Sequence, residues 1–333
     1  MVLLTGALPA TCFFYIRLNL CIRRRSKALL IHGNPFINQL PTMKRMLLTM
    51  LLGGALYSAW AQEDSTETTA KKPAKSYGKL TLNYLTNSVY NGRQDSISTP
   101  YLTPTLAYYA KSGFFVDGAL SYLTRSGSGR IDLTTFDMGY DFNIGKFDGE
   151  ISGSKFFYNS NSTNTKSSIT GSLSASAAYD FGFIHPSLLG TLSFGSATDY
   201  ALTASLDHAF YAAGDNLVIT PTVLLNAGTR NYYNAYYNQR KYAKLRKRVY
   251  YDISADVSGA AQFQALDYEF TVPVEYTVKH FTFSFLPSYA LPVNPAVITV
   301  NIKSSATSAT TSKTSTEKIS NVFFAAFEVA FKF

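Results

Sequence analysis

Strict alternation between apolar and polar residues recurs along most of this chain and constrains its fold more than any other feature. In the final segment Phe323, Phe327 and Phe331 occupy one face of an extended chain, while Glu328 and Lys332 occupy the other. Successive side chains of a β-strand point to opposite faces, so this period predicts strands with one apolar and one polar face. Most such segments span 10–14 residues, which is longer than a typical soluble strand.

Twelve strand-like segments are expected between residues 77 and 333. They are Lys79–Ser88, Tyr101–Ala110, Gly113–Arg125, Arg130–Asn143, Phe147–Tyr158, Ser168–Asp180, Ile184–Gly195, Asp199–Tyr211, Asn216–Ala227, Phe263–Thr277, Phe281–Leu291 and Asn321–Phe333. The fourth and fifth are ambiguous, because Asp137 and Lys155 disturb either assignment of their faces.

The connections between these segments alternate in length. Those after the even-numbered segments are tight turns, and those after the odd-numbered segments are usually longer, with a short one after the seventh. Short turns at one end and long loops at the other are typical of a transmembrane β-barrel. An even number of strands also places both ends of the barrel on the same side of the membrane.

Composition agrees with a membrane barrel better than with a soluble β-sandwich. The 333 residues are 46% hydrophobic and 15% aromatic but only 15% charged, against roughly 25% charged in an average soluble domain. Tyr and Phe concentrate near the strand ends, as in the aromatic girdles of outer-membrane barrels. Beyond residue 61 no apolar run approaches the roughly 20 residues of a spanning helix.

The N-terminal region carries an export signal at an internal methionine. A basic start at Met43, an apolar stretch from Met46 to Ser58 and the Ala59-Trp60-Ala61 pattern predict a signal peptide at residues 43–61. Residues 1–42 are either a true extension or a start-site artefact, and we favour the artefact. Residues 62–76 are polar and charged, which predicts a disordered periplasmic linker.

Removal of the signal changes the charge of the chain. The first 61 residues hold seven Lys or Arg and no acid, so 23 basic and 21 acidic residues remain, a net charge of +2 instead of +9. The mature chain therefore gives no electrostatic reason to expect a nucleic-acid partner. Both cysteines lie before residue 22, so neither disulfides nor thiolate chemistry is expected after cleavage.

An exported chain of alternating strands that ends in Phe331-Lys332-Phe333 resembles the Gram-negative outer-membrane β-barrels. The resemblance covers residues 77–333 and implies an all-β, closed antiparallel transmembrane barrel of about 12 strands in the outer membrane. It also implies contact with lipopolysaccharide and recognition of the last strand by the barrel-assembly machinery. It points to no particular family, substrate or oligomeric state.

Charged residues on the polar faces are candidates for the wall of a lumen. Asp267, Glu269 and Glu275 share one face of the tenth segment, and Glu328 and Lys332 share one face of the twelfth. We expect either a charged constriction that favours cations or acids neutralised by Lys79, Arg125 or Lys332. Inward Phe115, Leu123 and Phe156 would favour a filled lumen.

A second candidate is the basic, tyrosine-rich connection Arg230–Tyr251, which contains no acid. It is expected outside the cell, as a solvated loop, a contact for lipid-head phosphates or a site for a specific anion. Its basic residues are Arg230, Arg240, Lys241, Lys244, Arg246, Lys247 and Arg248. The later stretch Ser304–Lys318 is expected to be a flexible loop without a site.

The sequence gives no support for catalysis, a metal or a cofactor. His185-Pro186-Ser187 faintly resembles the His/Ser pair of outer-membrane phospholipases, but it lies beside a tight turn and is interrupted by proline. Adjacent Asp207 and His208 face opposite sides of one strand and cannot pair. His185 is therefore expected to be an interfacial imidazole.

We expect a porin- or channel-like barrel for passive passage of small solutes. The alternatives are a non-conducting surface barrel that presents its loops to partners and, third, an outer-membrane hydrolase.

Overall fold

A computed structural model describes residues 75–94, 98–238, 251–304 and 309–333. The signal peptide, residues 1–42 and most of the linker lie outside the described residues, and those assignments remain predictions. Among the described residues, no helix is long and apolar enough to cross a membrane.

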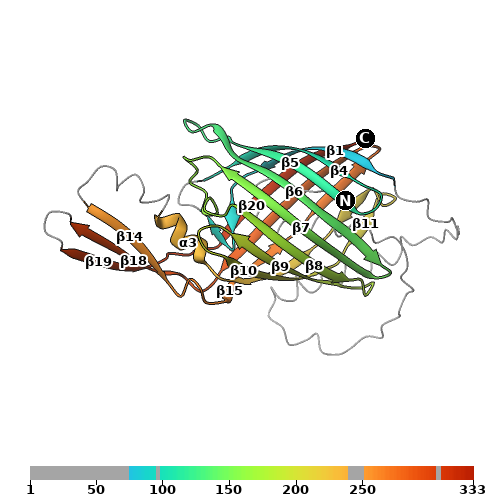
Figure 1. The fold of residues 1–333 in the computed structure, drawn as a ribbon. Helices are drawn as coiled ribbons and strands as arrows, with labels where there is room; N and C mark the ends of the chain where they lie inside the picture. Colours follow the sequence, from blue (N-terminus) through green and yellow to red (C-terminus); the bar gives the residue numbers. More distant parts are fainter. Residues whose placement is uncertain (1–74, 95–97, 239–250, 305–308) are drawn as a thin grey trace, which may run out of the picture. The chain divides into compact units, whose positions relative to one another are not determined.

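The alternating segments form a closed antiparallel barrel of 12 strands (Figure 1). Its wall consists, in chain order, of β1 (Tyr77–Leu85), β4 (Tyr101–Tyr109), β5 (Phe114–Leu123), β6 (Arg130–Ile144), β7 (Phe147–Tyr158), β8 (Gly171–Tyr179), β9 (His185–Phe194), β10 with β11 (Asp199–Asp207, Phe210–Ala212), β12 with β13 (Leu217–Ile219, Thr222–Gly228), β15 with β16 (Gln264–Thr271, Val274–Val278), β17 (Phe281–Pro292) and β20 (Val322–Lys332). Pairing of β20 with both β1 and β17 closes the ring. Closure satisfies the backbone groups that would otherwise remain free at a sheet edge.

Three wall segments are interrupted where the sequence predicts continuous strands. Pro221 separates β12 from β13, and Pro273 separates β15 from β16. Proline has no N–H to donate to a ladder, so each strand breaks locally while its two halves stay in the wall. The gap between β10 and β11 faces Pro221, whose carbonyl accepts a hydrogen bond from the His208 N–H at 3.4 Å.

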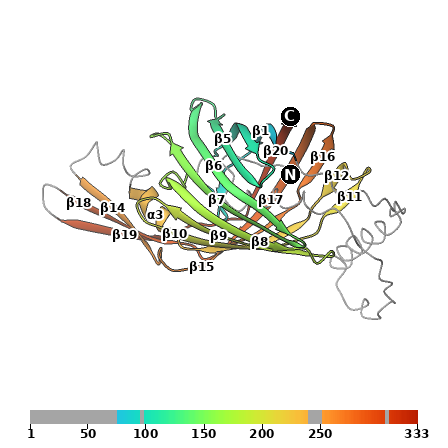
Figure 2. The same ribbon diagram turned by 45° about the vertical axis from the view of Figure 1, so that its right-hand side comes forward.

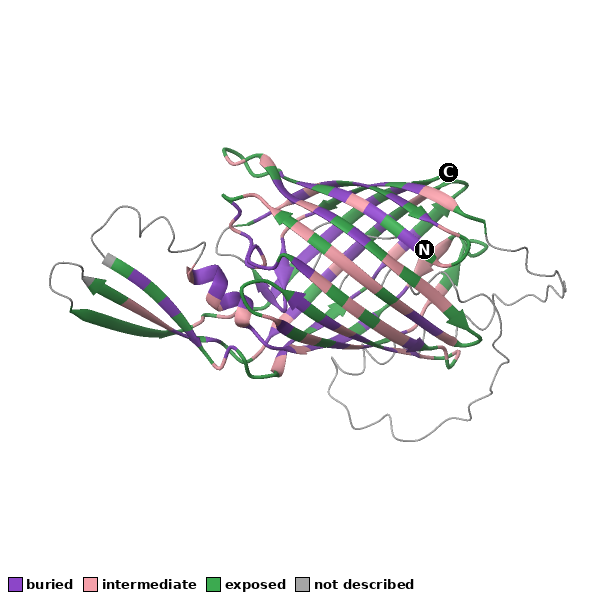
Figure 3. Ribbon diagram, viewed as in Figure 1, coloured by how far each residue is buried: buried purple, intermediate pink, exposed green. Residues whose placement is uncertain are grey.

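Exposed and buried residues alternate along the wall strands, as the bands of Figure 3 show, and the exposed row is rich in large apolar side chains. On β20, Phe323, Phe327 and Phe331 are exposed, while Phe324 and Glu328 are buried. The ambiguous pair is resolved in the same way. Asp137 faces inward, and Lys155 is exposed on the outward row, with its ammonium 5.7 Å from the centre of the Phe157 ring.

The two ends of the barrel differ, as the alternation of loop lengths predicts. At the turn end, tight turns contain residues with positive φ, such as Gly145 at 66° and Gly182 at 89°. Gly78 and Phe333 exchange backbone hydrogen bonds of 2.9 and 3.0 Å there, so both ends of the barrel sequence lie at this end. The opposite end, called the loop end below, carries the longer connections.

The loop end contains elements that alternation did not predict. They are the hairpin β2 (Val89–Tyr90) and β3 (Arg93–Gln94), the short helix α3 (Asn231–Tyr236), and a sheet of β14 (Tyr251–Ser258), β18 (Val297–Ser304) and β19 (Thr310–Thr316). This sheet and α3 lie at the end away from β11 and β12 (Figures 1 and 2). The expectation of a flexible loop over Ser304–Lys318 was wrong for β19 and for Glu317, because β19 pairs with β18 over seven residue pairs.

Candidate functional site

The inner wall of the barrel is rich in buried carboxylates. Asp267 and Glu269 on β15 are 0% exposed, Glu328 on β20 is 2% exposed and Glu275 on β16 is 9% exposed. These are the inward positions that alternation predicts. Glu275 is opposite Ser284, Ser284 is opposite Glu328, and Glu328 is opposite Asn83, so one polar row crosses four strands.

Few cations accompany these acids. The buried acids on the inward rows of the wall, away from the loop end, are Asp117, Asp137, Asp148, Asp207, Glu269, Glu275 and Glu328. On the same rows the one buried Lys or Arg within the described residues is Lys79, whose ammonium lies 3.6 Å from Glu328 Oε1. Acidic side chains therefore outnumber basic ones on these inward rows.

The two other predicted neutralisers are exposed at strand ends. Lys332 is at the end of β20, where its side chain is exposed and its ammonium lies 3.8 Å from the centre of the Tyr77 ring. Arg125 is exposed beyond the end of β5. Lys332 lies on the same side of the alternation as Glu328, but its side chain is exposed because it is the last residue of β20.

Hydrogen bonding divides the inner wall into two regions. Over β8, β9, β10 and β13, hydroxyl, amide and imidazole groups pair across strands. These pairs are Ser174 with Thr191 at 3.1 Å, Ser187 with Ser205, Thr203 with Asn226 at 2.7 Å, and His185 with Asp207 at 3.0 Å.

Over β15 and β17, the buried hydroxyls of Thr271, Ser284 and Ser288 lack hydrogen-bond partners within the described residues. Buried polar groups are nearly always satisfied by protein or by water. This region of the wall therefore requires water or a polar solute next to it.

The hairpin β2–β3 lies in the loop end and is held by Arg93, which is 4% exposed. Its guanidinium donates to the carbonyls of Asn91 and Leu266 at 2.8 and 3.2 Å, to those of Val293 and Asn294 at 3.0 and 3.1 Å, and to Glu317 Oε2 at 3.2 Å. These five bonds use all five N–H groups of an arginine. Arg93 thus anchors the hairpin to Leu266 of β15, to Val293 and Asn294 after β17, and to Glu317 after β19.

The two residues of β2 pack into different apolar clusters. Val89 joins inward side chains of the barrel wall that include Leu85, Leu123 and Phe324. Tyr90 joins a tyrosine cluster with Tyr232, Tyr233, Tyr236 and Tyr237, which also contains residues of β14 and β18. The loop end of the barrel is therefore filled by packed side chains, in agreement with the inward Leu123 expected from the sequence, while the inward Phe115 packs with Tyr109 at the turn end.

The tyrosine cluster has strongly perturbed hydroxyl groups. Burial raises the pKa of Tyr90 and of Tyr232 well above 10, and burial together with the nearby charge of Glu317 does the same for the pKa of Tyr233. The Tyr233 hydroxyl donates to Glu317 Oε1 at 2.8 Å. These phenols are neutral packing groups at physiological pH.

Arg230 is the one member of the predicted anion-contact set among the described residues. It is 3% exposed, and its guanidinium donates to the Asn294 carbonyl at 2.7 Å. The other six, Arg240, Lys241, Lys244, Arg246, Lys247 and Arg248, lie outside the described residues.

His185 is buried inside the wall, and the expectation of an interfacial imidazole was wrong for it. Its Nδ1 lies 3.0 Å from Asp207 Oδ2, because His185 at the start of β9 is directly opposite Asp207 at the end of β10. Sequence reasoning considered only Asp207 with its neighbour His208. The antiparallel register of the hairpin would have revealed the correct pair.

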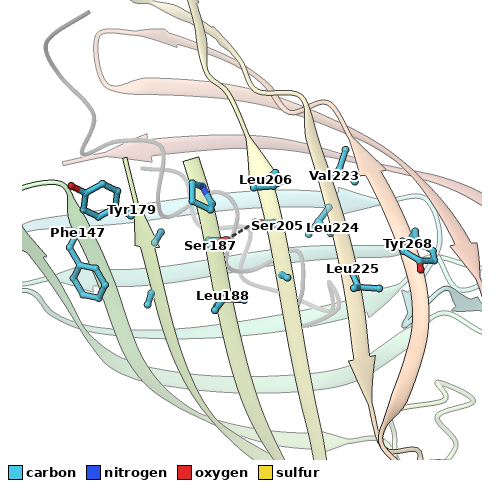
Figure 4. A pocket seen from close by; sticks show the side chains of 14 residues that line it. Phe147, Tyr179, Ser187, Leu188, Ser205, Leu206, Val223, Leu224, Leu225 and Tyr268 are labelled. Atoms are coloured by element: carbon cyan, nitrogen blue, oxygen red, sulfur yellow. Dashed lines mark hydrogen bonds between the residues drawn. The ribbon is translucent and has the colours of Figure 1, made fainter. Parts of the chain in front are cut away.

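Two further features of the described residues bear on the candidate site. No group of three or more His, Cys, Asp or Glu residues is arranged to hold a metal ion in this part of the chain. An apolar depression of about 640 Å³ spans β7 to β10, β13 and β15 (Figure 4). Most of its lining side chains belong to outward rows, and several of them, such as Leu188, Leu206 and Tyr268, are exposed. It is therefore a feature of the apolar outer surface.

No family model and no curated protein sequence matches this chain. Among solved structures, it is similar to the KdgM porin, with 11% identity, a TM-score of 0.41, and coverage of 77% of this chain and 99% of the porin. The NanC porin gives 7%, 0.38, 76% and 98%, and the outer membrane channel DcaP of Acinetobacter baumannii gives 11%, 0.29, 80% and 100%. Such identities and TM-scores assign the chain to no family, and its barrel fold is described from its own strand pairing.

Proposed function

We propose that this chain is an outer-membrane β-barrel for passive passage of small solutes, with a preference for cations. The observation that supports the proposal is the excess of acidic side chains inside the wall: away from the loop end, the described inward rows hold seven buried acids and one buried basic residue, Lys79. Low-dielectric walls focus such a potential and raise the local concentration of counter-ions. Rings of acids favour cations in the same way in other pores.

The outer surface supports the membrane location. Exposed outward side chains include Leu82, Leu106, Met138, Leu202 and Phe283 on five different wall strands. An exposed apolar belt on a closed barrel suits hydrocarbon, in which every backbone polar group must be paired internally. The loop end then faces outward and the turn end faces the periplasm.

Partners follow from this location. We propose contact of Arg240, Lys241, Lys244, Arg246, Lys247 and Arg248 with lipopolysaccharide phosphates; Arg230, which is buried and bound to the Asn294 carbonyl, does not belong to this set. Outward Lys155 extends this idea to the described residues, because a lysine near the loop end of β7 can place its ammonium at the headgroup level. The last strand, with outward Phe327 and Phe331, is proposed to be recognised by the barrel-assembly machinery.

A non-conducting surface barrel is the second candidate, and a specific observation favours it. The hairpin β2–β3 and the two apolar clusters fill the loop end. Passage therefore requires movement of this hairpin, whereas a surface role does not. The hydrolase alternative has weaker support, since His185 pairs with Asp207 while the Ser187 hydroxyl pairs with Ser205.

Planar-bilayer recording of the purified protein tests the proposal. We expect discrete conductance steps and a reversal potential of cation-selective sign under a KCl gradient. A protein that inserts and never conducts would favour the surface barrel, and anion selectivity would refute the proposed preference.

A further inference from the structure

The apolar depression of about 640 Å³ on the outer wall lies toward the turn end of the barrel. Its lining includes Phe147, the first residue of β7, and Tyr179, the last residue of β8, which are opposite each other in the ladder. Figure 4 shows these two rings at one end of the depression and Tyr268 at the other. Binding sites for small molecules have volumes of about 300–1,000 Å³, so the depression is large enough to hold part of a ligand.

Small side chains in one outward row help to form the depression. Ala177 on β8 and Ala204 on β10 are both opposite Leu188 of β9, which lies between them. The same row continues through Leu225 on β13 to Tyr268 on β15. Alanine occupies two of these five positions, so the row leaves space that Leu or Phe would fill.

The atoms around the depression favour a hydrocarbon ligand. None of its 14 lining residues is charged. The two hydroxyls of Ser187 and Ser205 belong to inward positions and are hydrogen-bonded to each other. Lipid tails are as apolar as this surface, so a bound chain gains chiefly by van der Waals contact with a concave wall.

A cation lies directly before the depression in the sequence. Lys146 is exposed in the turn between β6 and β7, next to Phe147. Its carbonyl accepts a hydrogen bond of 2.9 Å from the Asp180 N–H, so Lys146 also lies beside the end of β8. The Asp180 carboxylate is engaged in its own turn, where it accepts a bond of 2.6 Å from the Gly182 N–H. A lysine at this level can extend its ammonium to headgroup phosphates while its stem stays on apolar surface.

The uneven lining suits a flexible ligand better than a second barrel. Exposed Leu188 and Leu206 lie among the small Ala177 and Ala204. A flexible chain can follow such a surface, whereas a second copy would need a ridge of complementary shape.

We propose that the depression binds one acyl chain of a phospholipid in the periplasmic leaflet, and that Lys146 contacts the phosphate of this lipid. The site rests on the membrane location and orientation in the proposed function. It does not depend on the passage of solutes, so lipid binding and conduction can be measured separately.

Native mass spectrometry of the purified full chain in neutral detergent tests the site with three probes. Dioleoylphosphatidylglycerol supplies long chains and a phosphate, dihexanoylphosphatidylglycerol carries the same headgroup on short chains, and dioleoylglycerol has long chains without a phosphate. We expect dioleoylphosphatidylglycerol to bind most tightly, with its first molecule held more tightly than those that follow.

The double variant Ala177→Phe with Ala204→Phe fills the depression and should weaken the tight site about tenfold, the equivalent of roughly ten lost van der Waals contacts. Val116→Phe is the matched control, because Val116 is an exposed outward residue of β5, a strand that contributes nothing to the lining. Lys146→Gln should weaken binding of dioleoylphosphatidylglycerol about threefold, as for an exposed ion pair, and should leave binding of dioleoylglycerol unchanged.

Heat-dependent mobility on gels verifies that each barrel is folded, and Ala204→Phe alone replaces the double variant if that one fails to fold. Equal binding of the short-chain lipid, a tight site that persists in the filled variant, or an equal loss in Val116→Phe would overturn the site. Unchanged affinity in Lys146→Gln would overturn the phosphate contact. A dimer that dissociates in the filled variant would also overturn the site, because a second copy would then occupy the depression.

Lipid binding and conduction separate this site from the proposed passage. A tight lipid site in a barrel that never conducts would refute only the passage of solutes. Cation conduction by a barrel without a tight lipid site would refute only the site.

Discussion

At the scale of single residues, Arg93 is the side chain on which the arrangement of the loop end most depends. It is an interior cation whose donors are saturated by four carbonyls and one carboxylate from segments far apart in sequence. Removing such a group leaves carbonyls and Glu317 without partners in a buried place, which costs more than the bonds themselves contribute.

We predict that Arg93→Gln loosens the hairpin while the barrel remains folded. The expected local loss is about 2 kcal/mol, which corresponds to roughly thirtyfold faster amide exchange over residues 87–94. Hydrogen–deuterium exchange measured by mass spectrometry checks it. Arg125→Gln, at an exposed site, should leave exchange unchanged; equal exchange in both variants would show that Arg93 does not hold the hairpin.

The buried tyrosines predict a pH dependence of the same region. Unfolded tyrosine titrates near 10, and burial raises the pKa of Tyr90, Tyr232 and Tyr233 in the folded chain. Because the folded state holds these protons more tightly, their stabilisation is complete below pH 10 and is lost as pH rises toward the folded pKa values.

We therefore expect the loop end to loosen above about pH 10. The checks are tyrosinate absorbance and protease sensitivity of the hairpin, which should rise together. Tyr233→Phe should shift the transition to higher pH, and full ionisation at pH 10 without any change in protease sensitivity would contradict the account.

Residue-level reasoning from sequence succeeds where a residue lies within a regular strand. Asp267, Glu269 and Glu328 face inward as alternation requires. Leu266 departs because a bulge adds one residue to one strand only. His185 and Asp207 meet through a pairing register that single-strand periodicity does not contain.

At the scale of elements, the hairpin β2–β3 depends on its turn. Asn91 and Gly92 have φ values of 50° and 68°, and positive φ at both central residues suits a tight hairpin turn, for which Asn-Gly is the favoured sequence. A Cβ added at Gly92 would lie 2.7 Å from the Asp267 Cβ and 3.0 Å from the Pro292 Cα.

We predict that Gly92→Ala displaces the hairpin, and Gly127→Ala is a matched control. Gly127 has φ +71°, and a Cβ there would meet no atom within 4 Å. Both substitutions carry the strain of a left-handed alanine, about 1 kcal/mol, so their difference reports the contact with β15. Amide exchange of residues 87–94 should rise only for Gly92→Ala; the same effect from both would mean that the hairpin tip does not press on Asp267.

The elements beyond the barrel could not be predicted in the same way. Wall strands can be recognised in the sequence because their outer row is apolar, but β19 is a polar strand of Thr, Ser and Lys with every residue exposed. Its pairing with β18 comes from register, for example Thr299 opposite Thr314 with their hydroxyls 3.0 Å apart. Composition alone suggested a flexible loop there.

At the scale of the whole molecule, a regular barrel wall carries an irregular loop end. The number of wall strands and the difference between the two ends were predictable, because closure and alternation are properties of the entire chain. The filling of the loop end was not, since Val89, Phe324 and Tyr90 meet only after the barrel closes.

The central claim is that inward acids make the lumen prefer cations. The most direct test is the reversal potential of the purified protein in a planar bilayer under a tenfold KCl gradient. The triple variant Asp267→Asn, Glu269→Gln and Glu275→Gln removes three inward carboxylates, and Asp252→Asn with Asp256→Asn removes two exposed ones from β14.

We predict a cation-selective reversal potential for the unmodified chain and for the β14 variant. For the triple variant we predict that the reversal potential shifts markedly toward zero, because fewer inward carboxylates contribute to the negative potential of the lumen. Unchanged ion preference in the triple variant of a conducting barrel would contradict the claim and make these acids structural.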